Sequence, residues 1–172
     1  VCLTGFQTDG HDYIPKALEA GAAALVVERE VSVPKGIAVV RTADSRAALA
    51  LLSAAWFGHP AEEMTVIGLT GTKGKTTTAH MLKAILEAAG HKVGMIGTIG
   101  AVIAGEKVPT KNTTPESYEL HALFRRMADA GCDYVVMEAS SQGFKLRRTA
   151  GIRFDIGVFL NLSSDHIGPG EH

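Results

Sequence analysis

A glycine-rich loop at residues 71–76 is the segment of this sequence whose residue types and spacing most clearly indicate chemistry. It reads Gly-Thr-Lys-Gly-Lys-Thr, follows a short apolar segment and precedes an amphipathic one. In a strand–loop–helix of this kind, backbone N–H groups surround phosphate oxygens, and the helix N-terminus adds partial positive charge. Lys75 is then placed to reach the terminal phosphates, and the Thr76 hydroxyl to bind Mg²⁺. The loop therefore predicts a site for ATP and Mg²⁺ rather than a glycine-rich surface turn.

Leu69 stands where the longer phosphate-loop pattern has its first glycine. The loop keeps only the shorter form, Gly-x-x-Gly-Lys-Thr, which one superfamily of ligases uses. This difference points away from the generic nucleotide switches that carry the longer pattern.

Two further side chains could hold a metal ion near the phosphates. Glu138 directly follows the apolar run 134–137, and His166 follows the apolar run 155–160. If both runs are parallel strands, both side chains lie at the carboxyl edge of the sheet, where ligands bind. A carboxylate at that edge is a good Mg²⁺ ligand. The alternatives are a solvated glutamate at a strand end and an ordinary loop histidine.

The elements that position these residues alternate between short apolar runs and segments of helical period, which is typical of an α/β protein. We expect helices at 14–20, 44–56, 75–89 and 117–130. We expect strands at 1–4, 24–27, 37–40, 65–69, 92–96, 99–103, 107–108, 134–137 and 155–160. Gly and Pro between 58 and 63 interrupt the pattern. We therefore predict a small N-terminal α/β domain at residues 1–58 and a mostly parallel sheet with flanking helices at 64–172.

The bulk composition excludes several classes of protein. The 172 residues are 46% hydrophobic with a formal net charge of −1, so nothing indicates nucleic-acid binding. No apolar run approaches the roughly 18 residues of a membrane span, and we expect no membrane insertion. Cys2 and Cys132 lack metal-ligand spacing, so we expect buried thiols in a reducing cytoplasm. We also expect a monomer. Because both ends of the sequence look cut, we expect the chain to be a fragment of a longer protein.

Five short motifs, which occur in order over nearly the whole chain, resemble those of the Mur ligase family. They lie at 5–14 (GFQTDGHDYI), 70–77 (TGTKGKTT), 112–115 (NTTP), 137–141 (MEASS) and 161–166 (NLSSDH). In the same order, they are similar to the family's uridine-binding segment, ATP loop, substrate loop, metal and substrate segment, and Asn…Asp-His segment. The chain most resembles the subgroup that forms a UDP-N-acetylmuramoyl-tripeptide.

The resemblance implies roles for individual residues. Those implied to bind ATP are Gly71, Thr72, Lys73, Gly74, Lys75, Thr76 and Thr77. Those implied to be catalytic are Lys75, Glu138 and His166, and those implied to hold Mg²⁺ are Thr76, Glu138 and His166.

The resemblance also implies a set of substrate contacts. The residues implied to touch the muramoyl-dipeptide are Asn112, Thr113, Thr114, Ser140 and Arg148, and those near the uridine diphosphate are Phe6, Gln7 and Thr8. From the residues alone, Thr113 and Thr114 have loop capping as an alternative role, and Arg148 has a place in a solvated basic turn. The chain departs from the family at Gln142, where many members have His, and at Leu146, where some have Gln.

The reaction implied by the resemblance is an ATP-dependent amide ligation in peptidoglycan precursor synthesis. Its substrates would be UDP-MurNAc-L-Ala-D-Glu and a diamino acid, joined through an acyl phosphate. Three other ligases of the superfamily are alternatives: the one that acts next on the peptide, a folylpolyglutamate synthase and a cyanophycin synthetase. The N-terminal unit argues against the folate enzyme. Alternatives from other classes are a P-loop nucleotide-binding protein without ligase activity, and a fragment that only binds its ligands.

Overall fold

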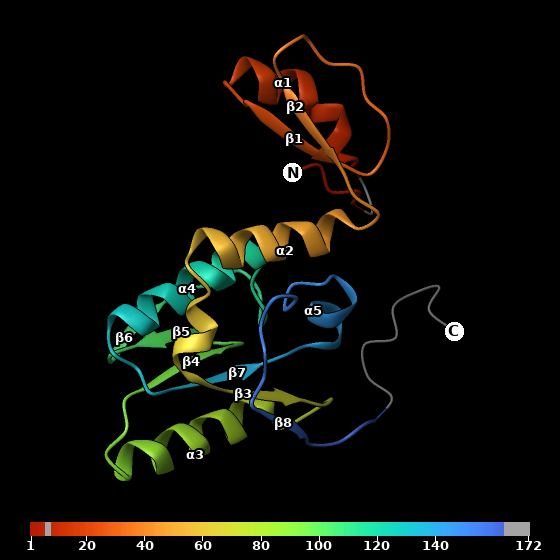
Figure 1. Cartoon of the computed structure of the whole chain (residues 1–172). Coiled ribbons are helices and arrows are strands. Elements are labelled where there is room, and N and C mark those ends of the chain that lie inside the picture. Colours follow the sequence, from red (N-terminus) through yellow and green to blue (C-terminus); the bar gives the residue numbers. More distant parts are fainter. Residues whose placement is uncertain (6–7, 164–172) are drawn as a thin grey trace.

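The computed structural model describes residues 1–5 and 8–163. Its main body is a six-stranded sheet with the strand order β6-β5-β4-β7-β3-β8 (Figure 1). The parallel strands are β4 (Val93–Gly97), β7 (Tyr134–Glu138), β3 (Thr65–Thr70) and β8 (Ile156–Phe159). An antiparallel hairpin of β5 (Gly100–Ile103) and β6 (Glu106–Val108) completes one edge. The predicted α/β fold with a mostly parallel sheet is therefore confirmed.

Helices cover both faces of this sheet, and each face has its own apolar core. α3 (Lys75–Ala88) lies on one face and α4 (Ser117–Asp129) on the other (Figure 1). On α4, Leu120, Phe124 and Met127 recur at helical spacing and are fully buried. The strands between the two helices are buried on both faces, which explains why β4 and β7 are continuous apolar runs rather than alternating ones.

His121 is a polar residue inside the core beside α4, and its side chain is fully buried. Among the described residues, neither of its ring nitrogens has a hydrogen-bond partner. Burial lowers the pKa of His121 below its ordinary value of 6.5, and His59 lowers it further, while the backbone of Ala150 opposes them. The imidazole is therefore neutral in the folded protein at pH 7.

The N-terminal residues form a second sheet, in which β1 (Ala24–Val27) and β2 (Ala38–Arg41) pair in parallel. The short helices η1 (Gly10–Tyr13) and α1 (Ile14–Glu19) precede it. The core of this unit consists of Cys2, Ile14, Leu25 and Val27. Cys2 and Cys132 are both free and buried, as expected.

The predicted strand at residues 1–4 is wrong. The backbone N–H of Cys2 donates to Val26 O at 2.9 Å, which is one contact with β1. Thr4 then pairs with Asp9 in a single bridge, and the N–H of Gly10 donates to Leu3 O at 2.8 Å. The chain thus turns back on itself after Thr4, and these contacts take the place of a ladder with β1.

α2 (Ser45–Trp56) joins the two sheets and packs along α4 (Figure 1). Asp44 caps it, because its Oδ1 accepts a hydrogen bond from the Ala47 N–H at 2.9 Å. The interruption at 58–63 folds as the short helix η2 (Pro60–Glu63) and also packs on α4. There Arg125 donates two hydrogen bonds to the Glu63 carboxylate, at 2.6 and 3.1 Å. The domain border within this segment stays a prediction.

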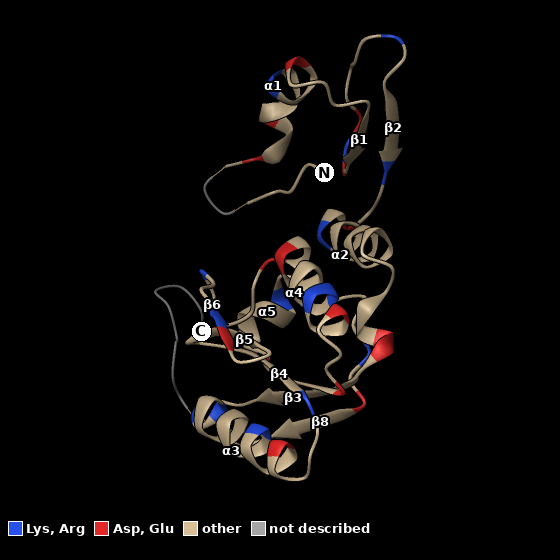
Figure 2. Ribbon diagram, turned by 90° about the vertical axis from the view of Figure 1, so that its left-hand side faces the viewer, with Lys and Arg blue, Asp and Glu red and all other residues tan. Residues whose placement is uncertain are grey.

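Charged side chains of both signs are spread over the surface helices. Figure 2 shows Lys or Arg together with Asp or Glu on α1, α3 and α4. This mixture agrees with the net charge of −1. Within residues 1–5 and 8–163, no helix has the length and apolar character needed to cross a membrane.

Candidate active site

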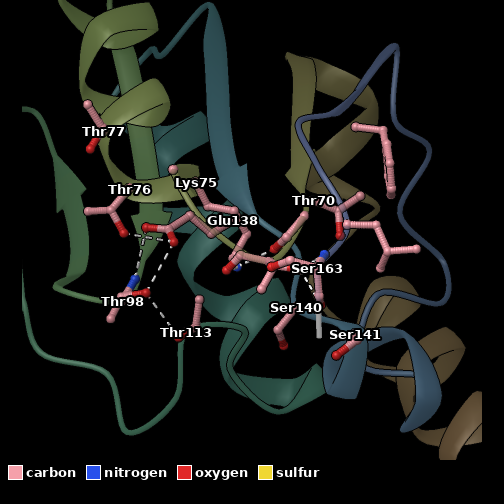
Figure 3. Close-up of a pocket in the computed structure, with 15 residues that line it drawn as sticks. Thr70, Lys75, Thr76, Thr77, Thr98, Thr113, Glu138, Ser140, Ser141 and Ser163 are labelled. Atoms are coloured by element: carbon pink, nitrogen blue, oxygen red, sulfur yellow. Dashed lines mark hydrogen bonds between the residues drawn. The ribbon is translucent and has the colours of Figure 1, made fainter. Parts of the chain in front are cut away.

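A pocket of about 580 Å³ opens where the carboxyl ends of β3, β7 and β8 meet the glycine loop (Figure 3). The parallel register of these strands brings their last residues to one edge of the sheet. The lining residues are Thr70, Gly71, Thr72, Gly74, Lys75, Thr76, Thr77, Thr98, Thr113, Glu138, Ser140, Ser141, Phe159, Leu162 and Ser163. The pocket thus surrounds Lys75 and Glu138 with hydroxyl groups and backbone amides.

The glycine loop runs from Thr70 at the end of β3 to Lys75 at the start of α3. Gly71 and Gly74 have φ angles of 139° and 85°, which residues with a Cβ rarely adopt. In the described chain no side chain caps α3, so the N–H groups of its first turn are available to an anion in the pocket. Leu69 is fully buried within β3, where it pairs with β7 and β8. It belongs to the sheet rather than to the loop, which explains why the first glycine of the longer pattern is not needed here.

Lys75 folds back over the loop that precedes it. Its ammonium group donates hydrogen bonds to Gly71 O at 2.6 Å and to Thr72 O at 3.3 Å. An ammonium group has three N–H donors, so a further one is available to an oxygen atom in the pocket. The contact between Lys75 and a terminal phosphate stays a prediction.

The Glu138 carboxylate is 2% exposed and is held by three hydrogen bonds on the pocket wall (Figure 3). Its Oε2 accepts from the Thr76 hydroxyl at 3.0 Å and from the Thr98 hydroxyl at 3.1 Å. Its Oε1 accepts from the Thr98 N–H at 3.1 Å. Gly97 lies directly against this carboxylate. The structure thus brings together Thr76 and Glu138, two of the three predicted metal ligands; the third, His166, lies outside the described residues.

Thr98 is a site residue that the sequence reasoning missed. It directly follows β4, which is parallel to β7 and adjacent to it. The rule that identified Glu138 at the carboxyl edge applies equally to the end of β4, so a signal for Thr98 existed in the sequence. Ser141, Phe159, Leu162 and Ser163 also line the pocket without having been predicted.

The predicted substrate loop borders the pocket through one of its threonines. Thr113 lines it and shares a hydrogen bond of 3.1 Å with the Thr98 hydroxyl. Thr114 is fully buried behind it, where its hydroxyl donates to Glu138 O at 3.1 Å and accepts from the Ser140 N–H at 3.0 Å. The Ser140 side chain lines the pocket and caps the short helix α5 (Ser141–Lys145). Thr114 therefore ties the substrate loop to the segment that carries Glu138.

Arg148 lies behind the same loop, and its side chain is nearly buried. Its Nη1 donates to Thr114 O at 3.1 Å, and its Nη2 lies 2.5 Å from Glu116 Oε1. The Arg148 Nε has no hydrogen-bond partner among the described residues. In this arrangement the guanidinium group holds the substrate loop in place.

The remaining predicted residues lie away from the pocket lining. Lys73 and Asn112 are exposed, and neither they nor Thr114 and Arg148 line the pocket. Thr8 is exposed in the N-terminal unit, where its carbonyl oxygen accepts a hydrogen bond from Gly5 N–H at 2.9 Å. The predicted residues Phe6 and Gln7 lie outside the described residues. No group of three His, Cys, Asp or Glu side chains in residues 1–5 and 8–163 could bind a metal ion.

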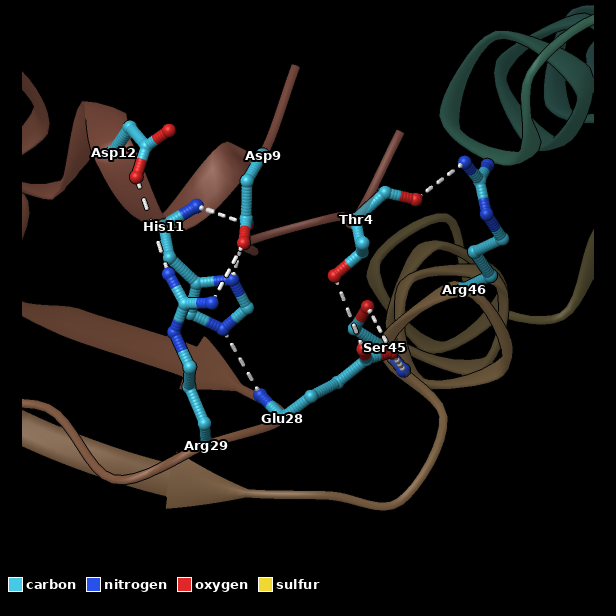
Figure 4. Close-up of polar contacts among 8 residues, drawn as sticks. All are labelled: Thr4, Asp9, His11, Asp12, Glu28, Arg29, Ser45 and Arg46. Atoms are coloured by element: carbon cyan, nitrogen blue, oxygen red, sulfur yellow. Dashed lines mark hydrogen bonds and ion pairs between the residues drawn. The ribbon is translucent and has the colours of Figure 1, made fainter. Parts of the chain in front are cut away.

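The predicted uridine-binding segment is anchored by a polar network around a buried histidine (Figure 4). His11 Nδ1 lies 2.6 Å from Asp9 Oδ1, and its Nε2 accepts a hydrogen bond from the Glu28 N–H at 3.2 Å. The backbone N–H of His11, followed by its side chain, lowers the pKa of Asp9, and Arg29 lowers it further. His11 thus fixes the loop that carries Thr8 against the end of β1.

The same network reaches α2 through Glu28 (Figure 4). The carboxylate accepts hydrogen bonds from Ser45 N–H at 2.8 Å and from the Ser45 hydroxyl at 2.7 Å. These two bonds are the largest influences that lower the pKa of Glu28. Arg46 of α2 donates to Thr4 O at 3.1 Å. The N-terminal unit is therefore hydrogen-bonded to the start of the helix that packs on α4.

A glycine loop between a parallel strand and a helix, with a lysine, a threonine and a buried carboxylate at the same sheet edge, defines a P-loop-type nucleotide-binding α/β protein. The comparisons with known proteins make the class more specific. The Mur ligase middle domain matches residues 69–172, and the catalytic domain of the Mur ligase family matches residues 1–68. The chain belongs to the Mur ligase family.

Among curated relatives, the UDP-N-acetylmuramoyl-L-alanyl-D-glutamate–2,6-diaminopimelate ligase of Clostridium perfringens is 49% identical over 167 residues, which are 97% of this chain and 34% of the relative. A solved ligase structure of the same name superposes with a TM-score of 0.80 at 26% identity, over 97% of this chain and 34% of that chain. A MurF ligase from Thermotoga maritima in complex with ADP gives a TM-score of 0.58 at 28% identity, over 96% and 35%. The chain thus spans about a third of the length of these proteins.

Proposed function

We propose that the protein is an ATP-dependent amide ligase that adds 2,6-diaminopimelate to UDP-MurNAc-L-Ala-D-Glu. The observation that carries the proposal is the convergence of Lys75, Thr76 and Glu138 on one pocket, in a chain 49% identical to a ligase of that name. The TM-score of 0.80 to a structure of the same ligase, against 0.58 to the MurF ligase, favours this reaction over the one named for MurF.

Nucleotide phosphates would bind at the glycine loop and the first turn of α3. The residues proposed to contact them are Gly71, Thr72, Lys73, Gly74, Lys75, Thr76 and Thr77. Free N–H groups at the start of α3 and the Lys75 ammonium group attract anions, which supports the proposal. The ADP in the related MurF structure is consistent with it.

A magnesium ion fits the oxygen atoms that face one another at the sheet edge. Glu138 offers a carboxylate, and Thr76 and Thr98 each offer a hydroxyl group within hydrogen-bond distance of it. Mg²⁺ prefers such hard oxygen ligands. We propose that Thr76, Glu138 and His166 hold it, with Thr98 keeping the carboxylate in position. When bound, the ion would neutralise negative charge on the phosphates.

The UDP-MurNAc-dipeptide would bind on the other side of the same pocket. Thr113 and Ser140 line it, and we propose direct contacts from both. We propose that Asn112, Thr114 and Arg148 complete this substrate site, supported by the hydrogen bond that joins the last two. The uridine diphosphate would lie near Phe6, Gln7 and Thr8 in the N-terminal unit.

The chemistry follows from these positions. A carboxylate does not react with an amine, because its oxygen is a poor leaving group. In the first step a carboxylate oxygen of the substrate attacks the γ-phosphorus of ATP, ADP departs and an acyl phosphate forms. The amine nitrogen then attacks the acyl carbon, loses a proton and expels inorganic phosphate. Lys75 would stabilise the charge that develops on the transferring phosphoryl group, which is the main contribution a protein can make to this reaction.

We also propose that the enzyme acts as a monomer in the cytoplasm, where its substrates would be found, and that residues 1–58 and 64–172 belong to separate domains. The two buried free thiols are consistent with a reducing compartment.

The test is product analysis with the protein expressed from its whole gene. ATP, Mg²⁺ and UDP-MurNAc-L-Ala-D-Glu are supplied with 2,6-diaminopimelate, lysine or another diamino acid in separate reactions. We expect a UDP-MurNAc-tripeptide, ADP and phosphate in equal amounts, and only with diaminopimelate. Slow ATP hydrolysis that neither substrate changes would overturn the proposal and favour a P-loop protein without ligase activity. Addition of D-alanyl-D-alanine to a tripeptide would instead identify a MurF-type ligase.

A further inference from the structure

The segment that follows β8, residues 161–163, is hydrogen-bonded along the phosphate loop. The Thr72 N–H donates to Asn161 O at 3.2 Å. The Thr72 hydroxyl accepts from the Ser163 N–H at 3.0 Å and donates to Ser163 O at 3.2 Å. The loop is therefore held from a part of the chain about 90 residues away in the sequence, in addition to its own helix.

The Asn161 side chain pairs with a single residue of the loop. Its Oδ1 accepts from the Lys73 N–H at 3.0 Å, and its Nδ2 donates to Lys73 O at 2.9 Å. The opposite orientation of the amide would place donor against donor and acceptor against acceptor, so the pairing fixes the orientation. An amide can satisfy both backbone groups of one residue in this way, whereas an ionised carboxylate, which has no donor, cannot.

The loop is shaped to receive this segment. A Cβ atom at Gly71 would lie 2.9 Å from Asn161 O and 3.0 Å from Asn161 N. The first distance is one that real Cβ atoms essentially never show, and the second is tighter than nine in ten real Cβ contacts, so the approach favours glycine. Asn161 itself is not among the described residues that line the pocket. Asn161 can therefore affect a bound ligand only by changing the conformation of the loop.

We propose that Asn161 is a positioning residue that holds the phosphate loop in its binding conformation before nucleotide arrives. A glycine-rich loop has many accessible conformations, and ordering them on binding weakens affinity. The amide pair with Lys73 removes this freedom in advance. The inference rests on the proposed function, because it assumes that the loop binds nucleotide phosphates.

The experiment is calorimetric titration of the protein expressed from its whole gene with ADP and Mg²⁺. Asn161→Leu keeps a similar volume but forms neither hydrogen bond, and we expect it to bind roughly 30-fold more weakly, the effect of losing about two ordinary hydrogen bonds. Asn161→Gln restores an amide on a longer side chain and should recover part of the affinity. Ile156→Ala, an exposed position of β8 away from the loop, is the matched control and should bind as the unaltered chain does.

Amide hydrogen exchange supplies a readout that does not depend on nucleotide. In Asn161→Leu the Lys73 N–H should exchange faster, whereas the Lys92 N–H, which donates to Asp133 Oδ2 at 2.8 Å, should not change. A space-filling role predicts that Leu binds at least as well as Gln, and that order of affinities would overturn the inference. Equal or tighter binding by Asn161→Leu would do the same. Absence of binding by the unaltered chain would overturn the proposed function as well.

Discussion

Gly97 offers a direct way to displace the Glu138 carboxylate without altering any functional side chain. The φ angle of Gly97 is outside the left-handed region, so its backbone accepts alanine without strain. A Cβ atom there would overlap Glu138 Oε1 and lie 2.7 Å from Glu138 Cδ. Ordinary contacts between carbon atoms begin at about 3.5 Å, so the carboxylate must move by roughly 1 Å.

The size of the effect follows from what the carboxylate would lose. Three hydrogen bonds hold it, and each bond to a charged group contributes about 1.5–3 kcal/mol. Loss of one or two of them corresponds to a decrease of about 100-fold in the rate of ligation, the same as other misplacements of about 1 Å. Gly97→Ala should therefore lower kcat/KM about 100-fold in the whole gene product. The Mg²⁺-dependent part of nucleotide affinity should fall too, while binding in the presence of a chelator should not change.

Gly94→Ala is the matched control, because it adds the same methyl group to the same strand. Its Cβ atom would lie 2.5 Å from Met127 Sδ, a flexible core side chain remote from the carboxylate. Overpacking of this kind costs about 1–3 kcal/mol of stability. Both variants should melt at lower temperature, but only Gly97→Ala should lose activity. If Gly97→Ala kept the unaltered rate and Mg²⁺ dependence, the carboxylate would not be positioned as described.

Three further predictions concern single side chains. Thr114→Val removes the hydroxyl that serves Glu138 O and the Ser140 N–H, and should lower the free energy of unfolding by about 1–3 kcal/mol in urea titration; an unchanged midpoint would contradict it. The folded-state pKa of His121 is below 6.5, so the stability contributed by its neutral form is complete above that pH and is lost as the pH falls below it. His121→Leu should flatten this part of the stability curve, and an unaltered slope between pH 7 and pH 5 would refute the assignment. Lys75→Ala should abolish ADP release that depends on the UDP-MurNAc-dipeptide, and near-normal release would sink the proposed role.

The phosphate loop could be predicted from the sequence because its chemistry is local. Two glycines, a lysine and a threonine within six positions, between an apolar run and a helix, fix both the backbone path and the charge. Glu138 was also predictable, because strands buried on both faces read as continuous apolar runs and their ends share one edge. Thr98 could have been predicted by applying the same rule to the end of β4.

Other features depend on contacts that sequence patterns do not record. α5 has five residues, too few for a helical period, and was not predicted. The strand predicted at residues 1–4 has suitable residues, but a turn at Gly5 brings Thr4 against Asp9. The segment 58–63 reads as a linker, yet Arg125 of α4 holds it through Glu63. In the last two cases a turn, or a partner distant in the sequence, decides the outcome.

Three threonine hydroxyl groups and the Glu138 carboxylate form a hydrogen-bonded row at the sheet edge, and this row has a thermodynamic consequence. Thr76 at the start of α3, Glu138, Thr98 and Thr113 of the substrate loop are joined by successive hydrogen bonds. A ligand at either end must act on the same few atoms. If nucleotide strengthens the hold on Thr113, then by linkage a ligand at Thr113 strengthens nucleotide binding by the same factor. Any coupling between the two halves of the pocket would therefore be reciprocal, with each ligand changing the affinity for the other by the same factor.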